Sequence, residues 1–397
     1  MPFPGARRLQ DVEPFLAMEV LERALALERE GASVLHLEVG EPDFPAPQPV
    51  IDACQRALRD GETHYTDSRG LLPLREAISR NLGDRFGVAP DPDRILVTMG
   101  TSPAMLLTFQ TLLDPGDEVI LGSPHYPCVP NFIRLAGGVP VLVRTDPEAG
   151  YRLDPPRVQA AMTARTRAIV VCSPANPTGA IQTRETLAAL AALGPTLVSD
   201  EIYDGLVYDG ARLSSMLEHS DEAFVLDGFS KRYAMTGFRL GWVVAPEWAA
   251  RPLQVLQQSL FISASSFVQL AGIAALEHGA EAVVGMRETY AVRRDRLVAG
   301  LRRLGFGLAQ APEGAFYVLA DARPLGALGR DSRALAFTLL ERAHVGVTPG
   351  VDFGQAAEGF LRFCYAVADE VIDEALARLE RVLGELGRAP LSGGEGA

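Results

Sequence analysis

The sequence predicts an α/β protein: a large domain in which helices cover both faces of a mostly parallel sheet, and a smaller α+β domain from both termini. Short apolar runs alternate with helical stretches from about residue 90 to 246, as in a parallel sheet with crossover helices. After residue 283 the chain changes to long charged helices and a few strands. Its 397 residues are enough for two domains. We assign residues 46–282 to the large domain, and residues 1–45 and 283–397 to the small one.

The first expected element is a helix over residues 14–30, with Pro14 in its first turn and Gly31 placed to end it. "SVLHLEVG" (33–40) is typical of a short strand and leads into a Pro-rich turn. In the large domain Gly100-Thr101-Ser102-Pro103, directly after the first expected strand, is expected to open a helix that runs to about Leu113. The seven strands expected there are 95–99, 118–123, 139–144, 168–173, 196–200, 223–228 and 239–245.

The C-terminal part predicts a second sheet and a long helix. "EGAFYVLAD" (313–321) and "GFLRFCYA" (359–366) are the expected strands. The helix covers residues 369–386, because its apolar side chains fall on one stripe. The polar tail 387–397 is expected to be disordered.

Composition excludes several classes of protein. A net charge of −13 and a pI near 5.0 argue against a general binder of nucleic acid or anionic membranes. No apolar run reaches the roughly 18 residues of a membrane span, and the first residues lack the apolar core of a signal peptide, so a cytoplasmic protein is expected. The four cysteines and six histidines have neither disulfide-framework nor metal-ligand spacing, so no metal site is expected.

One residue stands out chemically: Lys231, in "FSKRYAMTGFR", is the only lysine among 37 basic residues. Arginine replaces lysine as a surface cation, but its guanidinium stays protonated and cannot act as an amine nucleophile. A lone lysine therefore indicates an amine that must lose its proton, as in carbonyl chemistry. Chance survival in an arginine-rich composition is the alternative, and this observation alone leaves both open.

Polar residues collect after the predicted strands, where parallel α/β sheets bind ligands. A helix N-terminus with glycine and hydroxyls suits a phosphate, although such caps are common. A Ser-His-Asp triad fits poorly because there is no GxSxG elbow, and a dinucleotide site lacks GxGxxG. Phosphate site, amine and carboxylate together suit pyridoxal 5′-phosphate. The residues at these positions are Gly100, Thr101, Ser102, Asn176, Asp200, Tyr203, Ser230, Lys231 and Arg239.

At this point the chain closely resembles the class I/II aminotransferases, which are fold-type I pyridoxal-phosphate enzymes, and within them the bacterial aspartate-aminotransferase-like branch. The similarity runs through "GEPDF" (40–44), "HYTDSRGLLPLREAI" (64–78), "SPHYP", "SPANPTG", "SDEIYDGLVYDG", "SKRYAMTGFRLGW", "GAFYVLAD" and "LRFCYA". It implies an aminotransferase that moves an amino group between an L-amino acid and a 2-oxo acid.

The resemblance also implies residue roles around the reacting atoms. Lys231 forms the aldimine with the cofactor and then moves the proton between the substrate and the cofactor, which makes it the catalytic residue. Asp200 keeps the pyridine nitrogen protonated. Tyr203 and Asn176 hydrogen-bond the ring's phenolic oxygen, and Tyr126 stacks on the ring. A helix cap for Asp200 and a turn position for Tyr126 are the ordinary structural alternatives.

Further implied roles concern the phosphate, the substrate and the partner subunit. Tyr65 matches a tyrosine that reaches the phosphate from the other subunit, so a homodimer with shared sites is expected. Arg362 matches the arginine that binds the substrate α-carboxylate, with Gly40 and Asn176 beside it, although a solvent-facing strand arginine is the alternative. The residues expected to hold the phosphate are Gly100, Thr101, Ser102, Ser230 and Arg239.

One departure from the family pattern concerns the substrate. Aspartate-selective relatives carry a basic residue where this chain has Ser102, so neutral, aromatic or broad amino donors are expected. A different pyridoxal-phosphate reaction remains open, either a C–S β-lyase or a ring-forming lyase, because those enzymes share Lys231, Asp200 and Arg362. A cofactor-binding regulator without turnover is a further alternative, but the chain has no basic helix for DNA.

Overall fold

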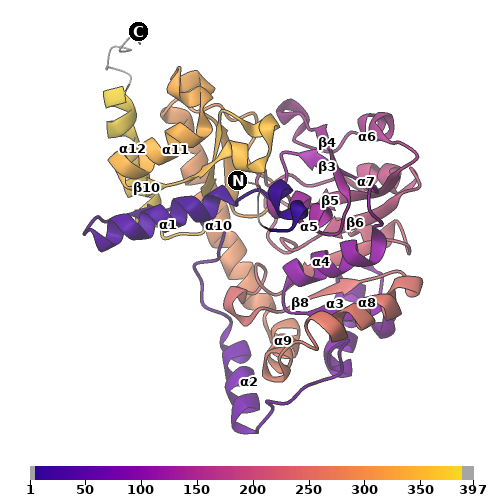
Figure 1. Ribbon diagram of the computed structural model, residues 1–397. Coiled ribbons are helices and arrows are strands. Elements are labelled where there is room, and N and C mark those ends of the chain that lie inside the picture. Colours follow the sequence, from indigo (N-terminus) through magenta and orange to yellow (C-terminus); the bar gives the residue numbers. More distant parts are fainter. Residues whose placement is uncertain (1–4, 387–397) are drawn as a thin grey trace. The chain divides into compact units, whose positions relative to one another are not determined.

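The computed structural model describes residues 5–386, and its contacts divide the chain into two compact units that we describe separately (Figure 1). Unit 1 holds the chain up to Pro14, then Glu41–Thr289 and Pro312–Ala315. Unit 2 holds Phe15–Gly40, Tyr290–Ala311 and the described chain from Phe316 to Leu386. The N-terminal segment up to Pro14 thus groups with unit 1. The tail 387–397 lies outside the described residues.

Unit 1 is built on a seven-stranded sheet in the order β2-β8-β7-β6-β5-β3-β4. All neighbouring pairs are parallel except those of β8, which runs antiparallel to β2 and β7. Each of the seven strands predicted in this region is present. Their bounds are β2 Ile95–Thr98, β3 Glu118–Ser123, β4 Val139–Arg144, β5 Thr166–Cys172, β6 Thr196–Asp200, β7 Phe224–Gly228 and β8 Gly241–Val244.

Helices cover both faces of this sheet, because successive strand residues point to opposite sides. Leu96 and Val97 show the alternation: Leu96 packs in one apolar core with Phe109, and Val97 in another with Ile78. Two cores explain why the strands are apolar at nearly every position. The helices of unit 1 are α2 Gln48–Arg59, α3 Leu72–Phe86, α4 Thr101–Leu112, α5 Cys128–Leu135, α6 Pro155–Ala161, α7 Arg184–Ala191, α8 Glu247–Leu260 and α9 Ser266–His278.

Unit 2 is the α+β part of the chain. A three-stranded antiparallel sheet has the order β11-β12-β9, and a parallel pair joins β1 to β10. Its elements are α1 Leu16–Arg29, β1 Leu35–His36, β9 Tyr317–Asp321, α11 Ser332–Ala343, β10 Val345–Gly346, β11 Thr348–Pro349, β12 Phe360–Cys364 and α12 Asp369–Leu386. The helix α10, Ala280–Arg303, contributes residues to both units.

The observed elements refine the predicted ones in unit 2. The predicted strand 33–40 contains only the two-residue β1. Leu37 still bonds Gly346 and Cys364 through its backbone, but the ladder does not continue toward Gly40. The short strands β10 and β11 were not predicted, since two residues are too few for an alternating pattern. Over residues 5–386, no single helix is long and apolar enough to cross a membrane.

Candidate active site

The predicted site residues of unit 1 follow strand ends that meet at one edge of the sheet. Gly241, which opens β8, pairs with Thr98 at the end of β2 and with Gly228 at the end of β7. On the other side of β7, Asp200 closes β6 and pairs with Cys172 at the end of β5. The sheet therefore gathers the segments that carry Gly100, Thr101, Ser102, Asn176, Asp200, Tyr203, Ser230, Lys231 and Arg239.

An anion cradle forms where α4 begins. Gly100 has φ +93°, a conformation that favours glycine, and a Cβ placed on it would lie 2.7 Å from Nη2 of Arg239. A Cβ on Gly241 would lie 3.0 Å from the backbone nitrogen of Thr101. Both glycines thus let a guanidinium and the first N–H groups of α4 approach one another. Free helix N–H groups and an arginine are the donors that a phosphate prefers.

Lys231 lies in a tight turn that follows β7. The turn is closed by a backbone hydrogen bond from the N–H of Tyr233 to the carbonyl of Phe229, at 3.2 Å. Ser230 is buried, Lys231 is half-buried, and Arg239 at the far end of the loop is exposed with φ +54°. The lysine is therefore held at the sheet edge by a short, hydrogen-bonded loop.

Asp200 is the acid of this edge. It is 7% exposed, and burial raises the pKa of its carboxyl to about 6. The backbone N–H of Ile202 and the positive charge of Lys231 oppose that rise in pKa, whereas Glu201 adds to it. An influence of Lys231 on the pKa of Asp200 means that the two charges lie within electrostatic reach of each other. A cation placed against Asp200 would keep the carboxylate ionised.

A cavity of unit 1 brings three of the predicted residues together: Tyr126, Asn176 and Asp200 line it jointly. Tyr203 is buried, 4% exposed, in the turn that follows β6. The cavity also contains residues that the sequence did not single out. Those with polar side chains are His125, Thr145, Tyr151, Cys172, Thr178 and Gln182.

In unit 2, Arg362 is buried on β12, with 2% of its surface exposed, so it is not the solvent-facing strand arginine of the alternative interpretation. Its Nη2 donates to the carbonyl of Glu38 and to Oγ1 of Thr348, the latter at 3.1 Å. The guanidinium lies 4.4 Å from the ring centre of Tyr317 and 5.1 Å from that of Phe353. Ring faces attract cations and restrict the side chain to one orientation.

Gly40 belongs to the same neighbourhood of unit 2. A Cβ on Gly40 would lie 2.0 Å from the hydroxyl oxygen of Tyr317, so only glycine leaves that hydroxyl its place. The predicted pair of Gly40 and Arg362 is thus connected through Tyr317. Their role toward a carboxylate stays a prediction.

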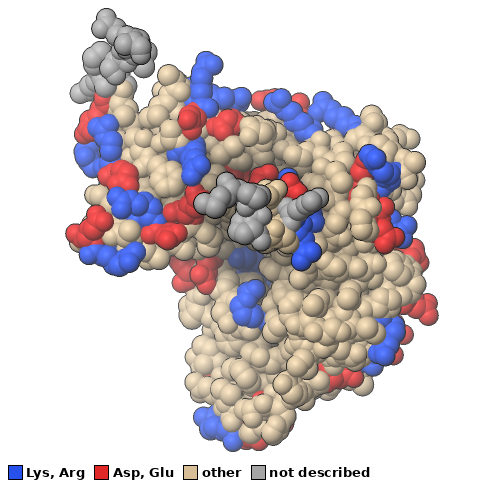
Figure 2. Space-filling model, in the orientation of Figure 1, with Lys and Arg blue, Asp and Glu red and all other residues tan. Residues whose placement is uncertain are grey.

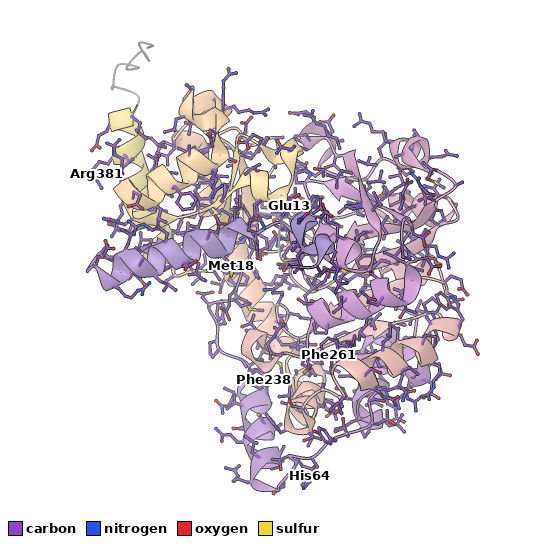
Figure 3. All side chains as sticks on the ribbon, in the orientation of Figure 1. Glu13, Met18, His64, Phe238, Phe261 and Arg381 are labelled. Atoms are coloured by element: carbon purple, nitrogen blue, oxygen red, sulfur yellow. The ribbon has the colours of Figure 1, made fainter. Side chains whose placement is uncertain are left out.

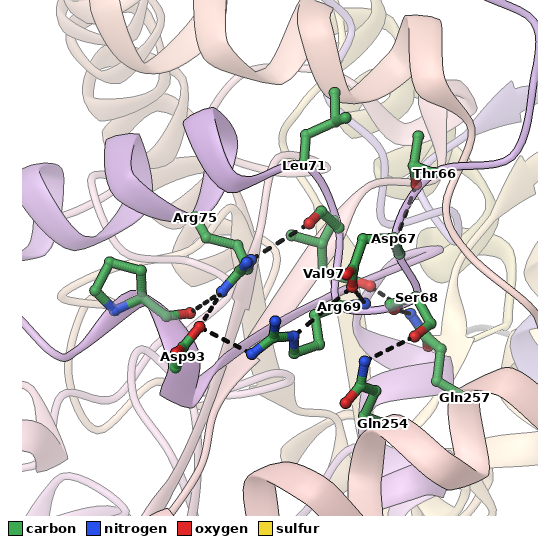
Figure 4. A network of polar contacts seen from close by, with 12 residues as sticks. Thr66, Asp67, Ser68, Arg69, Leu71, Arg75, Asp93, Val97, Gln254 and Gln257 are labelled. Carbon is green, nitrogen blue, oxygen red and sulfur yellow. Dashed lines mark hydrogen bonds and ion pairs between the residues drawn. The ribbon is translucent and has the colours of Figure 1, made fainter.

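Tyr65 stands apart from the other predicted residues. It is 82% exposed, in the loop between α2 and α3, next to His64 (Figure 3). The loop itself is firmly held: Gln257 donates to the carbonyl of Ser68 at 2.9 Å, and Arg69 pairs with Asp93 at 2.8 Å (Figure 4). An exposed aromatic ring on a fixed loop is suited to contact another molecule.

Sequence reasoning missed a buried ion cluster beside these residues, made of Arg85, Glu201, Asp204, Asp227 and Arg232. Asp204 follows Tyr203 and Arg232 follows Lys231 directly in the chain. The sequence could have indicated the cluster, because a charged residue directly follows each of the two predicted residues. Arg85 gave no signal, because a cation on a helix is usually solvated.

Comparison with known proteins gives consistent likenesses. A family model described as aminotransferase class I and II matches residues 32–379. An aspartate/prephenate aminotransferase of Thermus thermophilus is 41% identical over 386 residues, covering 96% of this chain and 98% of that protein. A (5-formylfuran-3-yl)methyl phosphate transaminase of Methanocaldococcus jannaschii is 38% identical over 383 residues, covering 96% of this chain and 100% of that protein.

Solved structures agree with this. The aspartate aminotransferase of Thermus thermophilus with maleate superposes with a TM-score of 0.91 at 40% identity, covering 96% of this chain and all of that one. The likeness therefore extends over nearly the whole chain, including both units.

Proposed function

Since this chain belongs to the class I and II aminotransferase family, we propose that its transaminase activity depends on Lys231 and is directed to neutral, aromatic or broad amino donors. Members of this family use pyridoxal 5′-phosphate, and the chain is a pyridoxal-phosphate-dependent aminotransferase that acts on amino acids and 2-oxo acids. The observation that carries the assignment of the lysine is its half-buried place in the hydrogen-bonded turn after β7, the strand that pairs with β6, which Asp200 closes.

The residues of the edge fit this cofactor. The cradle of Gly100, Thr101 and Arg239 supplies N–H donors for a phosphate, and additional hydroxyls come from Ser102 and Ser230. Asp200 can hold a proton on a ring nitrogen, and Tyr126 lines the same cavity for a flat ring. When bound, the cofactor supplies an aldehyde and a ring that withdraws electrons from the substrate's α-carbon.

The chain's own groups then perform the proton chemistry. The ε-amino group of Lys231 would hold the cofactor, and its Nζ would accept and return the substrate's α-proton. Tyr203 and Asn176 act as hydrogen-bond partners that set the proton affinity at that nitrogen. Asp200 stays ionised beside a protonated ring nitrogen, because the opposite charge lowers its pKa.

For the substrate, we assign its α-carboxylate to Arg362 and its specificity to the residues around Ser102. The sandwich of Arg362 between Tyr317 and Phe353 preorganises a planar fork for a carboxylate. Ser102 is uncharged, so it offers no cation to an acidic side chain. Neutral, aromatic or broad amino donors are therefore proposed. Gly40 leaves the Tyr317 hydroxyl its place in the same neighbourhood as Arg362.

The exposed Tyr65 loop supports the proposal of a homodimer with shared sites. A cytoplasmic location, with no nucleic acid or membrane partner, is proposed from the acidic composition. Several large apolar side chains in the segments on either side of the Tyr65 loop and at the end of α8 are also exposed, as in surfaces that contact another protein. Figure 2 shows the part of unit 1 around α2 and α9 as largely uncharged. The exposed side chains there are Leu58, Tyr65, Leu72, Val255, Leu260 and Ile262.

A half-reaction screen tests the proposed function. Each amino acid is mixed in turn with the cofactor-loaded enzyme, and the visible absorption of the lysine-bound cofactor is followed until it bleaches. A 2-oxo acid should then restore the absorption. Bleaching by phenylalanine, methionine or alanine well ahead of aspartate supports the proposal. Product formation that needs no 2-oxo acid would instead identify a lyase.

A further inference from the structure

Two tight turns carry the residues whose relative position decides the chemistry proposed above. Tyr203 lies in a turn with backbone hydrogen bonds from Asp204 N–H to the Glu201 carbonyl at 2.8 Å and from Leu206 N–H to the Tyr203 carbonyl at 3.0 Å. Lys231 lies in the Phe229–Tyr233 turn. The turns follow neighbouring strands, β6 and β7. Backbone bonds within each turn do not fix one turn against the other.

A buried ion pair does connect them. Nη1 of Arg232, the residue after Lys231, lies 3.2 Å from Oδ2 of Asp204, the residue after Tyr203. The two side chains are only 14% and 8% exposed. Gly205 leaves room for this arginine side chain. It has φ +87°, and a Cβ on it would lie 3.2 Å from Cγ, Cδ and Nε of Arg232. The side chain of Arg232 thus lies flat across the Tyr203 turn.

A second arginine enters the same cluster from α3. Arg85, one residue before the end of that helix, contacts Asp204 and has its Nη1 3.9 Å from Oδ2 of Asp227. Asp227 is the second-last residue of β7. Its Oδ1 accepts a hydrogen bond from the N–H of Gly228, the last residue of that strand, at 2.6 Å. Arg85 therefore joins both turns to a third element of the sheet's covering layer.

Burial shifts the pKa values of several groups in this cluster. Burial raises the pKa of Asp227 to about 7 and that of Glu201 above its usual range, while both arginines pull the pKa of Asp227 down. Burial and the charge of Arg232 lower the pKa of Arg85 to about 10. Glu201 is held by Oγ of Ser199 and the N–H of Met216, and the ring of Tyr233 faces Arg232.

Such clusters are a poor means of stabilising a fold, because desolvation of the ions offsets much of their attraction. A buried ion cluster is better explained as a means of selecting one arrangement of the elements that it connects. We propose that Arg232, Asp204 and Arg85 are positioning residues that fix the Lys231 turn against the Tyr203 turn. This inference rests on the proposed function of Lys231 and Tyr203.

The distance between these turns has a direct spectroscopic consequence. The nitrogen of Lys231 and the phenol of Tyr203 are proposed to act on the same bound cofactor, so their separation sets the pH at which the lysine-bound cofactor gains or loses its proton. A merely structural cluster would leave that pH unchanged once the protein is folded.

The experiment compares four variants with the wild-type holoenzyme by titrating the visible absorption of the lysine-bound cofactor against pH. Arg232→Met removes the pair, and Arg232→Lys keeps the charge without the fork. Arg232→Met with Asp204→Asn removes both charges of the pair and leaves Arg85 opposite Asp227. The control is Arg75→Met: Arg75 is a buried arginine of the same helix as Arg85, bound to Asp93 at 3.0 Å and to the Pro92 carbonyl at 2.7 Å (Figure 4).

We expect the titration midpoint of Arg232→Met and of the double variant to move by roughly one pH unit, with partial return in Arg232→Lys. The melting temperature should fall in Arg75→Met as well, but its midpoint should stay with the wild type. In steady state, kcat should fall roughly tenfold with little change in KM. If the double variant folds and titrates within about 0.2 pH units of the wild type, the positioning role is wrong. If the wild type itself shows no lysine-bound absorption, the proposed function fails and this inference with it.

Discussion

At the scale of single residues, the unusual feature is that the chain has only one side-chain amine. Lys231 is the chain's one lysine, half-buried in a turn at the sheet edge where Asp200 feels its charge. A guanidinium at this position would keep a positive charge but could not condense with an aldehyde. Charge and nucleophilicity can therefore be separated by one substitution.

Lys231→Arg should bind pyridoxal phosphate without a covalent bond and lose at least about a thousandfold in kcat. Borohydride reduction followed by peptide mass analysis checks the linkage. In the wild type the reduced cofactor should be found on the peptide containing residue 231, and in the variant on no peptide. Label on the variant at another site would refute the assignment.

The burial of Asp200 predicts a pH dependence in the cofactor-free protein. Folding raises the pKa of this carboxyl from its usual range to about 6, so the folded state binds the proton more tightly than the unfolded state. Stability contributed by this group is then lost as pH rises from about 4 to 6. The Asp200→Asn variant lacks this carboxyl, so its stability should not fall for this reason as the pH rises.

The difference in unfolding free energy between Asp200→Asn and the wild type, both without cofactor, should grow over that pH interval to about 2–3 kcal/mol. Denaturant titrations at several pH values measure it. Other buried carboxylates, such as Asp227, are common to both proteins and cancel in the comparison. A difference that is constant with pH would contradict this prediction.

Ser102 allows a test of the proposed substrate class. Placing a cation there with Ser102→Lys should raise kcat/KM for aspartate by roughly tenfold, the value of one favourable charge interaction, and lower it for phenylalanine. The ratio of the two kcat/KM values is the measurement. A wild-type enzyme that already prefers aspartate strongly would show that another cation serves the acidic side chain.

At the scale of elements, the anion cradle depends on a close approach rather than on a particular side chain. Gly100 and Gly116 both have φ +93°, but a Cβ on Gly100 would meet Arg239, whereas nothing lies within 4 Å of a Cβ on Gly116. The two positions thus separate backbone strain from intrusion into the cradle.

Gly116→Ala should lower stability by about 1 kcal/mol, and Gly100→Ala by roughly 1–3 kcal/mol, because φ +93° with ψ 174° is a conformation almost restricted to glycine. Only Gly100→Ala should weaken pyridoxal phosphate binding, by at least about tenfold, because the new methyl group displaces the guanidinium from the first turn of α4. Equilibrium dialysis and thermal melts separate the two effects. Equal loss of affinity in both variants would argue against the cradle.

The elements also show what a sequence can and cannot predict. The strands of unit 1 were predictable because burial on both faces makes them continuous apolar runs. Asp200 was singled out by its place at a strand end, and Lys231 because it is the only lysine of the chain. Arg85 was not, because its burial is decided by Asp204 and Asp227, more than a hundred residues further along the chain. Local patterns do not contain such long-range partners.

At the scale of the whole molecule, the question is which surfaces meet another copy of the chain. Tyr65 projects from a loop fixed by Gln257 and Arg69, and exposed apolar side chains surround it. If the partner subunit supplies this tyrosine, each site contains Lys231 of one chain and Tyr65 of the other. Substitutions of Tyr65 and Lys231 then affect residues that different subunits contribute to one site.

Mixing Tyr65→Ala and Lys231→Arg chains should consequently restore activity. After exchange of subunits, half of the dimers are mixed, and each of these has one intact site, so about a quarter of wild-type activity is expected. Activity before and after co-refolding is the comparison. Recovery of none, with dimers present by light scattering, would place Tyr65 outside the partner's site.

The single half-buried lysine has a practical consequence for handling the protein. Active esters used to attach dyes or supports react with amines, and no side chain other than that of residue 231 can accept them. With cofactor in place, that amine is engaged, so labelling should be confined to the α-amino group. The excess dye taken up by a preparation would then count its empty catalytic centres directly.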